Sequence, residues 1–83
     1  GVLYFEYGRN PTAFKYPRGR DRSPGLALRS GSWKLLADPA GERVELYDLD
    51  ADPRETNDLA TQRSDIAAPL AQDLRRWWQS LPR

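Results

Sequence analysis

The stretch LALRSGSWKLLA, residues 26–37, decides the fold that the sequence predicts. Its two apolar halves, 26–29 and 33–37, each have the length and composition of a short strand. Between them lies Ser-Gly-Ser, a tight turn in which Gly31 adopts positive φ without steric cost. The stretch therefore predicts a β-hairpin.

Two further strands are expected on either side of this hairpin. Residues 2–7 are aromatic and β-branched, and residues 43–49 alternate between apolar and polar side chains after a turn at 38–41. The last three strands form a meander, and 2–7 joins it across residues 8–25. Because 2–7 is apolar on both faces, we expect it to be covered on both sides.

The C-terminal part of the chain has the pattern of one amphipathic helix over 64–81. Ser64 is the expected N-cap, Asp65 complements the helix dipole, and Pro82 ends the helix. The apolar stripe consists of Ile66, Leu70, Leu74, Trp77 and Leu81. The predicted fold class is α+β: one domain, 1–83, with a four-stranded antiparallel sheet and one C-terminal helix packed on one face.

Composition and charge exclude several classes of function. The chain has no Cys and no His, which excludes disulfides, thiolate chemistry and the usual zinc sites. Five basic residues lie within 9–22 beside Asp21 alone, whereas eight carboxylates lie within 38–58 beside Arg43 and Arg54. A net charge of +1 argues against nucleic-acid binding. No apolar run has the length of a membrane span.

Three stretches, in this order, resemble the C-terminal end of type I sulfatases, the formylglycine-dependent arylsulfatase family. Residues 27–36, ALRSGSWKLL, resemble the family's hairpin, and ELYDL at 45–49 followed by DPRET at 52–56 resembles its next segment. Residues 4–7, YFEY, resemble the preceding strand, with Tyr7 where related sequences have His. The match covers nearly the whole chain.

The likeness is closer to sulfatases of the arylsulfatase A and galactosamine-6-sulfatase kind. Their sequences commonly have Tyr-Gly-Arg-Asn, found here at 7–10, and Arg-Ser-Pro-Asn-Leu-Ala, found here at 22–27 with Gly25 in place of Asn. The resemblance implies hydrolysis of sulfate esters by a formylglycine nucleophile beside calcium, both in a large N-terminal domain. Neither the formylglycine motif nor the catalytic His residues occur here. We therefore expect no catalytic residue, no metal ligand and no cofactor in this chain, and no activity of the chain alone.

The basic residues suggest where the chain could border a substrate. Guanidinium groups bind sulfate or carboxylate bidentately, and an aromatic ring stacks on a sugar or aryl group. The expected substrate-binding residues are Arg9, Asn10, Tyr16, Arg18, Arg20 and Arg22. The alternative is a solvated loop held by salt bridges to the acidic 38–58 stretch.

Other charged residues favour structural roles. We expect Lys34 to protect an edge strand and Arg29 to pair with Glu6, with Glu45 or with the catalytic domain. The carboxylates of Asp48, Asp50 and Asp52 alternate as in a calcium loop, but the sequence after them lacks the required Gly and Glu, so turn formation and helix capping are expected.

Because the chain begins at Gly1 and contains no Met, we expect a fragment of a longer protein. Its expected partners are its own N-terminal catalytic domain and a sulfated small molecule or glycan, and the fragment's exposed apolar surface favours dimers. The resemblance implies a periplasmic, secreted or lysosomal parent, while the residues themselves give no compartment. The alternative is a free-standing interaction or anionic-ligand-binding module.

Overall fold

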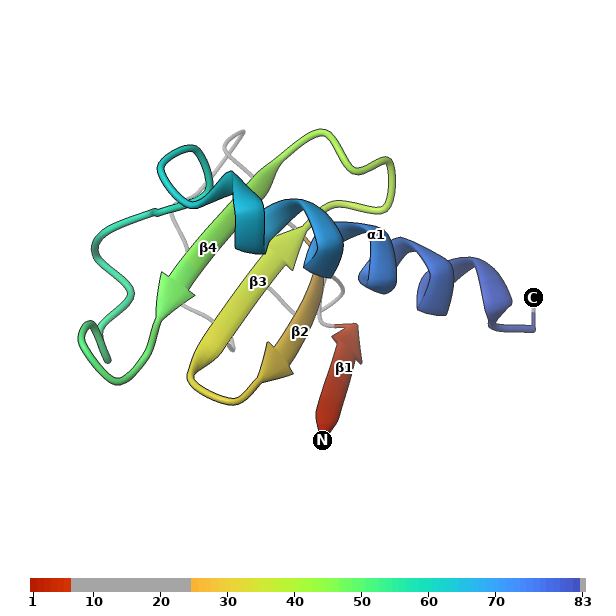
Figure 1. The fold of residues 1–83 in the computed structure, drawn as a ribbon. Coiled ribbons are helices and arrows are strands. Elements are labelled where there is room, and N and C mark those ends of the chain that lie inside the picture. The colour runs from red at the N-terminus through yellow and green to blue at the C-terminus, as the bar shows by residue number, and fades with distance from the viewer. Residues whose placement is uncertain (7–24, 83) are drawn as a thin grey trace.

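The computed structural model describes residues 1–6 and 25–82, which form a four-stranded sheet with one helix across it (Figure 1). The strands are β1 (Val2–Glu6), β2 (Leu26–Ser30), β3 (Trp33–Ala37) and β4 (Val44–Asp48), and the helix is α1 (Ser64–Ser80). The predicted α+β fold is confirmed. Tyr7, predicted to end the first strand, lies outside the described residues.

All neighbouring strands are antiparallel, in the order β1-β2-β3-β4. The hairpin of β2 and β3 pairs Ser30 with Trp33, which leaves Gly31 and Ser32 as its turn. Gly31 has a φ of 62°, and Ser32 does not have positive φ, as in a type II′ turn. The predicted hairpin and meander are therefore confirmed.

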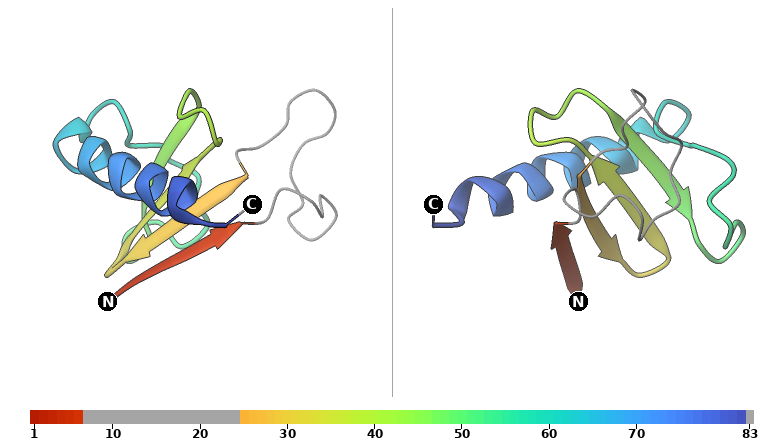
Figure 2. Two further views of the ribbon diagram at one scale, coloured as in Figure 1. Left: turned by 90° about the vertical axis from the view of Figure 1, so that its right-hand side faces the viewer. Right: turned by 180° about the vertical axis from the view of Figure 1, so that it is seen from behind.

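The main core lies between the sheet and α1. Figure 2 shows α1 lying on one side of the sheet, with its axis crossing the strands. The register places Tyr4, Leu28, Leu35 and Leu46 side by side on this face, and Leu74 of α1 packs with them. All four of these leucine side chains are fully buried. This packing confirms the predicted apolar stripe of the helix at its centre.

The helix begins with Arg63 as the N-cap residue, so the prediction of Ser64 at this position was wrong. The Arg63 carbonyl oxygen already accepts hydrogen bonds from the N–H groups of Ile66 (3.0 Å) and Ala67 (2.9 Å). This makes Ser64 the first helical residue and leaves the cap without a side-chain hydrogen bond. Arg63 instead forms an ion pair with Asp65 at 3.1 Å.

The predicted end of the helix needs a correction of one residue. Helix α1 ends at Ser80, and Leu81 is extended, with a φ of −75° and a ψ of 143°. A residue before proline avoids the helical region, so Pro82 ends the helix as predicted.

Within residues 1–6 and 25–82, strand β1 is covered on one face only, so the predicted cover of its second face stays a prediction. On the helix side, the Tyr4 ring stacks on Trp77 with centroids 5.1 Å apart, and the Tyr4 hydroxyl donates to Asp73 at 3.1 Å. On the other side, Leu3 is 60% exposed and Phe5 is 44% exposed. The helix therefore buries only part of the apolar surface of β1.

We expect Leu74→Ala to lower the free energy of unfolding by about 2–5 kcal/mol, because it leaves a cavity between α1 and the sheet. Urea denaturation followed by circular dichroism measures the change. Leu81→Ala is the matched control, since Leu81 is half-buried and lies outside the main core cluster. Equal losses for the two variants would contradict the assigned core.

Candidate functional site

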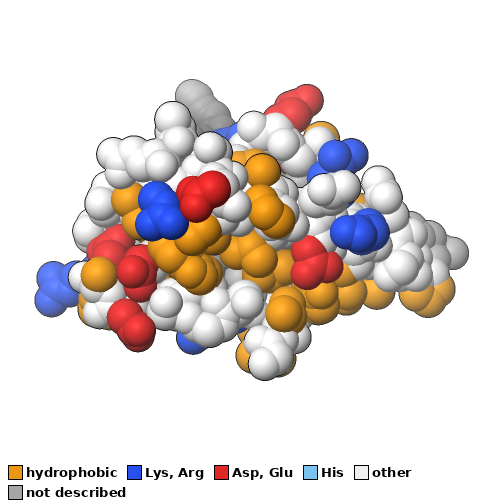
Figure 3. Space-filling model, in the orientation of Figure 1, with side chains coloured by type: hydrophobic (Ala, Val, Ile, Leu, Met, Phe, Trp, Pro, Cys, Tyr) orange, Lys and Arg blue, Asp and Glu red, His pale blue; other side chains and the backbone are white. Residues whose placement is uncertain are grey.

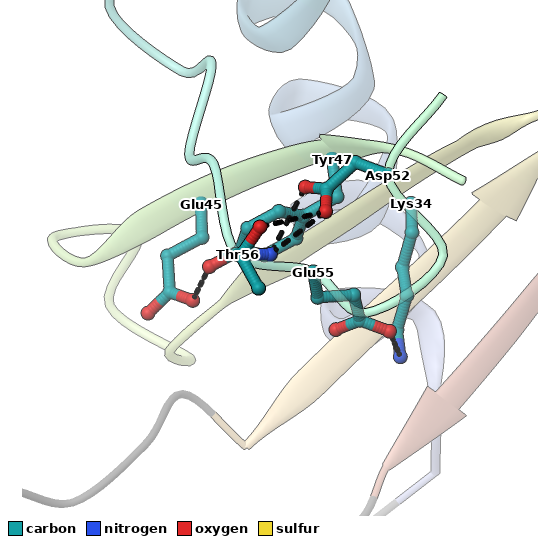
Figure 4. Close-up of polar contacts among 6 residues, drawn as sticks. All are labelled: Lys34, Glu45, Tyr47, Asp52, Glu55 and Thr56. Atoms are coloured by element: carbon teal, nitrogen blue, oxygen red, sulfur yellow. Dashed lines mark hydrogen bonds and ion pairs between the residues drawn. The ribbon is translucent and has the colours of Figure 1, made fainter. Parts of the chain in front are cut away.

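The residues predicted to contact substrate all fall outside the described part of the chain: Arg9, Asn10, Tyr16, Arg18, Arg20 and Arg22. Within the described ranges, polar side chains gather on the sheet face opposite α1 and in the segment after β4. Figure 4 shows Lys34, Glu45 and Tyr47 from the strands beside Asp52, Glu55 and Thr56 from this segment. We call these six residues the polar network.

Asp52 organises the segment after β4 through backbone hydrogen bonds. Its carboxylate accepts the N–H groups of Thr56 (3.0 Å) and Asn57 (2.9 Å), and also the Thr56 hydroxyl (2.9 Å). Hydrogen bonds from the Thr56 and Asn57 N–H groups favour the ionised form, so they lower the pKa of Asp52. The carboxylate therefore closes a turn.

Glu55 and Lys34 connect that turn to the middle of the sheet. Glu55 has a φ of 57°, a left-handed backbone that is uncommon for a residue with a side chain, and its carboxylate contacts the Lys34 ammonium at 2.8 Å. Lys34 lies on β3, between β2 and β4, so its predicted role on an edge strand was wrong. The two residues are 21 positions apart, and no spacing in the sequence indicates their contact.

Tyr47 and Glu45 form a second polar contact on the same face. They are two residues apart on β4, so their side chains share one face of the strand, and the Tyr47 hydroxyl donates to Glu45 at 2.6 Å. Burial raises the pKa of Tyr47, and the hydrogen bond to Glu45 adds to this effect. The ring also packs with Ala27 and Leu36 in a small second core cluster. The tyrosine is therefore a structural residue held in its neutral form.

Two further carboxylates in this part of the chain, those of Asp48 and Asp58, also serve backbone turns, as predicted. Asp58 accepts the N–H groups of Leu46 (3.0 Å) and Ala60 (2.9 Å), and Asp48 accepts the Asp50 N–H at 3.1 Å. Over residues 1–6 and 25–82, no group of three or more carboxylates is placed to hold a metal ion. These side chains therefore do not fit a calcium ion.

Arg29 lies on the same open face but does not pair with Glu6 or Glu45, contrary to the prediction. Glu6 is on the helix face of β1, and Glu45 is two strands away and bonded to Tyr47. The guanidinium donates to the Gly31 carbonyl at 3.4 Å, and its buried Nε has no hydrogen-bond partner among the residues that the structure describes. A buried donor without an acceptor costs about 1–3 kcal/mol.

An open groove of about 320 Å³ lies beside the start of α1. Small side chains from the helix, including Ala67 and Ala71, line it together with Val44 and Glu42. Glu42 is the ionisable residue of this lining, and one carboxylate alone supplies neither a nucleophile nor an acid–base pair.

The described helix is too short and too polar to cross a membrane.

Comparison with known proteins gives one informative match. No family model matches the chain. A segment of 50 residues is 42% identical to Arylsulfatase K of Mus musculus. The match covers 58% of this chain and 9% of the length of Arylsulfatase K. The chain thus corresponds to a small part of this relative. The match supports a sulfatase-like relationship.

We expect Asp52→Asn to lower stability at pH 7 and to change its dependence on pH. The folded pKa of Asp52 is lowered, so its contribution is present above the unfolded pKa of about 3.9 and is lost as the pH falls through the folded value. The stability difference between wild type and variant should therefore shrink on acidification. Urea denaturation at pH 7 and at about pH 2 tests this.

Asp50→Asn is the matched control for this experiment. Asp50 is exposed in the same segment, and among the described residues its carboxylate accepts no hydrogen bond. We expect no change in stability at either pH. A stability difference for Asp52→Asn that is the same at pH 7 and pH 2 would contradict the assigned role of the carboxylate.

Proposed function

We propose that the chain is the C-terminal subdomain of a formylglycine-dependent sulfatase, of the arylsulfatase A and galactosamine-6-sulfatase kind. The parent, meaning the complete enzyme, would hydrolyse sulfate esters of glycans or aryl groups. The observation that carries the proposal is the 42% identity to Arylsulfatase K over 50 residues. The motifs at 4–7, 27–36 and 45–56 support it, because they occur in the family's order.

In this proposal the chain supports catalysis without performing it. Sulfate ester hydrolysis by this family needs a formylglycine made from Cys or Ser in a specific motif, and the chain has no Cys and no such motif around its Ser residues. Many of the described carboxylates are bonded to backbone N–H groups, to Lys34, to Tyr4, to Tyr47 or to Arg63. The nucleophile and calcium would therefore come from the N-terminal domain of the parent.

The first role of the chain would be to brace that domain. The sheet face opposite α1 supports this role, because it carries Arg29 with a buried donor that lacks an acceptor. A carboxylate or carbonyl of the catalytic domain beside Arg29 would strengthen the hydrogen bonding of the guanidinium. This contact is one of the partners expected for Arg29 from the sequence.

The second role would be to border the substrate with the basic residues between 9 and 22. Arg18 and Arg20 would bind the sulfate or a carboxylate of the substrate, and Tyr16 would stack on its ring. Arg9, Asn10 and Arg22 would complete the border. The two roles require the same longer protein.

The experiment that tests the proposal is to sequence the reading frame upstream of Gly1. We expect several hundred codons that include a Cys/Ser-x-Pro-x-Arg motif and Asp-rich calcium ligands. A stop codon followed by a separate start codon immediately before Gly1 would contradict the sulfatase proposal. The free-standing interaction module would then be the better account.

In the complete enzyme, we expect Arg18→Ala combined with Arg20→Ala to raise KM for an anionic sulfated glycan by about tenfold. Each charge-assisted hydrogen bond that is lost contributes about 1.5–3 kcal/mol, reduced by exposure to solvent. Steady-state kinetics measures KM and kcat separately. Arg54→Ala is the matched control, since Arg54 is exposed in the acidic segment. An unchanged KM in the double variant would contradict a substrate contact.

A further inference from the structure

The two edges of the sheet differ in how their backbone groups are used. At the β4 edge, the Leu46 N–H donates to the Asp58 carboxylate at 3.0 Å, and the Leu46 carbonyl accepts the Leu59 N–H at 2.7 Å. The segment after β4 thus occupies its outer side. Strand β1 forms the opposite edge of the sheet.

The strand register shows which groups of β1 face outward. In an antiparallel sheet, successive residues direct their N–H and C=O groups alternately to the two neighbouring strands. Leu46 directs its groups away from β3, so its neighbours Glu45 and Tyr47 bond to β3. Because Leu46 pairs with Leu35, and Leu35 with Leu28, the same alternation directs the backbone groups of Ala27 and Arg29 toward β1.

The residues of β1 opposite Ala27 and Arg29 therefore bond to β2. The remaining three, Val2, Tyr4 and Glu6, direct their backbone N–H and C=O groups to the outside of the sheet. These groups form a row that can bond to one more strand.

The side chains of β1 add an apolar surface to this edge, beside which no further strand lies among residues 1–6 and 25–82. Leu3 is 60% exposed, Phe5 44% and Val2 39%, and these are the large hydrophobic residues that are exposed in the described part of the chain. The strand contains no Pro and no Lys, which commonly protect edges, and its one charge is Glu6 at the end.

Helix α1 extends beyond this edge. In Figures 1 and 2 the C-terminal half of α1 continues past β1 on the same side of the sheet. Figure 3 shows hydrophobic side chains gathered below this half of the helix and beside the sheet. Trp77, Trp78 and Leu81 of this region are half-buried. A strand placed next to β1 would have its helix-side face partly covered.

We propose that the occupant of this edge is a second copy of the chain, with β1 pairing antiparallel to β1 of the other copy about a two-fold axis at Tyr4. The two Tyr4 residues then lie opposite each other and exchange backbone N–H···O=C hydrogen bonds. This fits the strand alternation, because the backbone groups of Tyr4 point out of the sheet. Leu3 of one copy lies opposite Phe5 of the other, on the face away from α1, and Glu6 lies opposite Val2. The register is thus self-complementary: apolar residues meet, and no like charges lie opposite each other.

The pairing makes one continuous eight-stranded sheet with both helices on the same face. The two-fold axis is perpendicular to the sheet, so each helix extends toward the other copy. The contact joins two short strands and is smaller than the standard interface of about 1,600 Å². We therefore infer a dimer that dissociates on dilution.

The test is sedimentation equilibrium of the 83-residue chain between about 10 μM and 1 mM, a range that resolves a weak dimer. We expect a monomer–dimer equilibrium, and we expect Phe5→Lys to weaken association by at least about tenfold, because it places a charge in the apolar pair. Ala51→Lys is the matched control: it adds the same charge at an exposed position in the turn after β4 and should leave association unchanged.

A second measurement does not depend on the folding of any variant. In a mixture of ¹³C-labelled and unlabelled wild-type chain, filtered NMR experiments should show contacts between Leu3 methyl groups of one copy and the Phe5 ring of the other. A wild-type chain that stays monomeric at 1 mM, or a dimer without these contacts, would overturn the proposal. Neither readout uses sulfatase activity, so the proposed function stands or fails separately.

Discussion

The contact between Leu74 of α1 and the leucines of three neighbouring strands is the interaction on which the structure depends. Leu28, Leu35 and Leu46 lie in register across β2, β3 and β4, and all four side chains are fully buried. Burying each leucine contributes about 1.5–3 kcal/mol. With no Cys in the chain, this layer has no disulfide to assist it. A single helix can cover one face of the sheet, which leaves the other face and β1 for other contacts.

The arrangement of the polar residues also follows from having a single helix on one face of the sheet. The segment between β4 and α1 must cross from one end of the sheet to the helix, and its carboxylates satisfy backbone N–H groups along the way, chiefly through Asp52 and Asp58. Lys34 and Glu55 fix this segment to the open face of the sheet. Because these acids are engaged in turns, they are not available as a catalytic group. This agrees with the proposal that the chemistry belongs to another part of a longer enzyme.

Much of the fold is predictable from the sequence because its signals are local. The hairpin follows from Gly31 between two apolar runs, and the helix follows from the four-residue spacing of Ile66, Leu70 and Leu74. The role of Lys34 and the pairing of Arg29 with Glu6 or Glu45 were wrong, because strand position and side-chain face depend on register between distant segments. The N-cap was wrong by one residue, since the turn before the helix makes Arg63 the first hydrogen-bond acceptor. The predicted substrate residues between 9 and 22 remain predictions.

The most direct test of the account is to compare the complete enzyme with a form that lacks residues 1–83, measuring hydrolysis of an aryl sulfate and thermal stability. If these residues brace the catalytic domain and border its substrate, the deletion will lower both kcat/KM and Tm. If the deletion leaves both unchanged, the chain has neither role, and the sulfatase account of its function is contradicted.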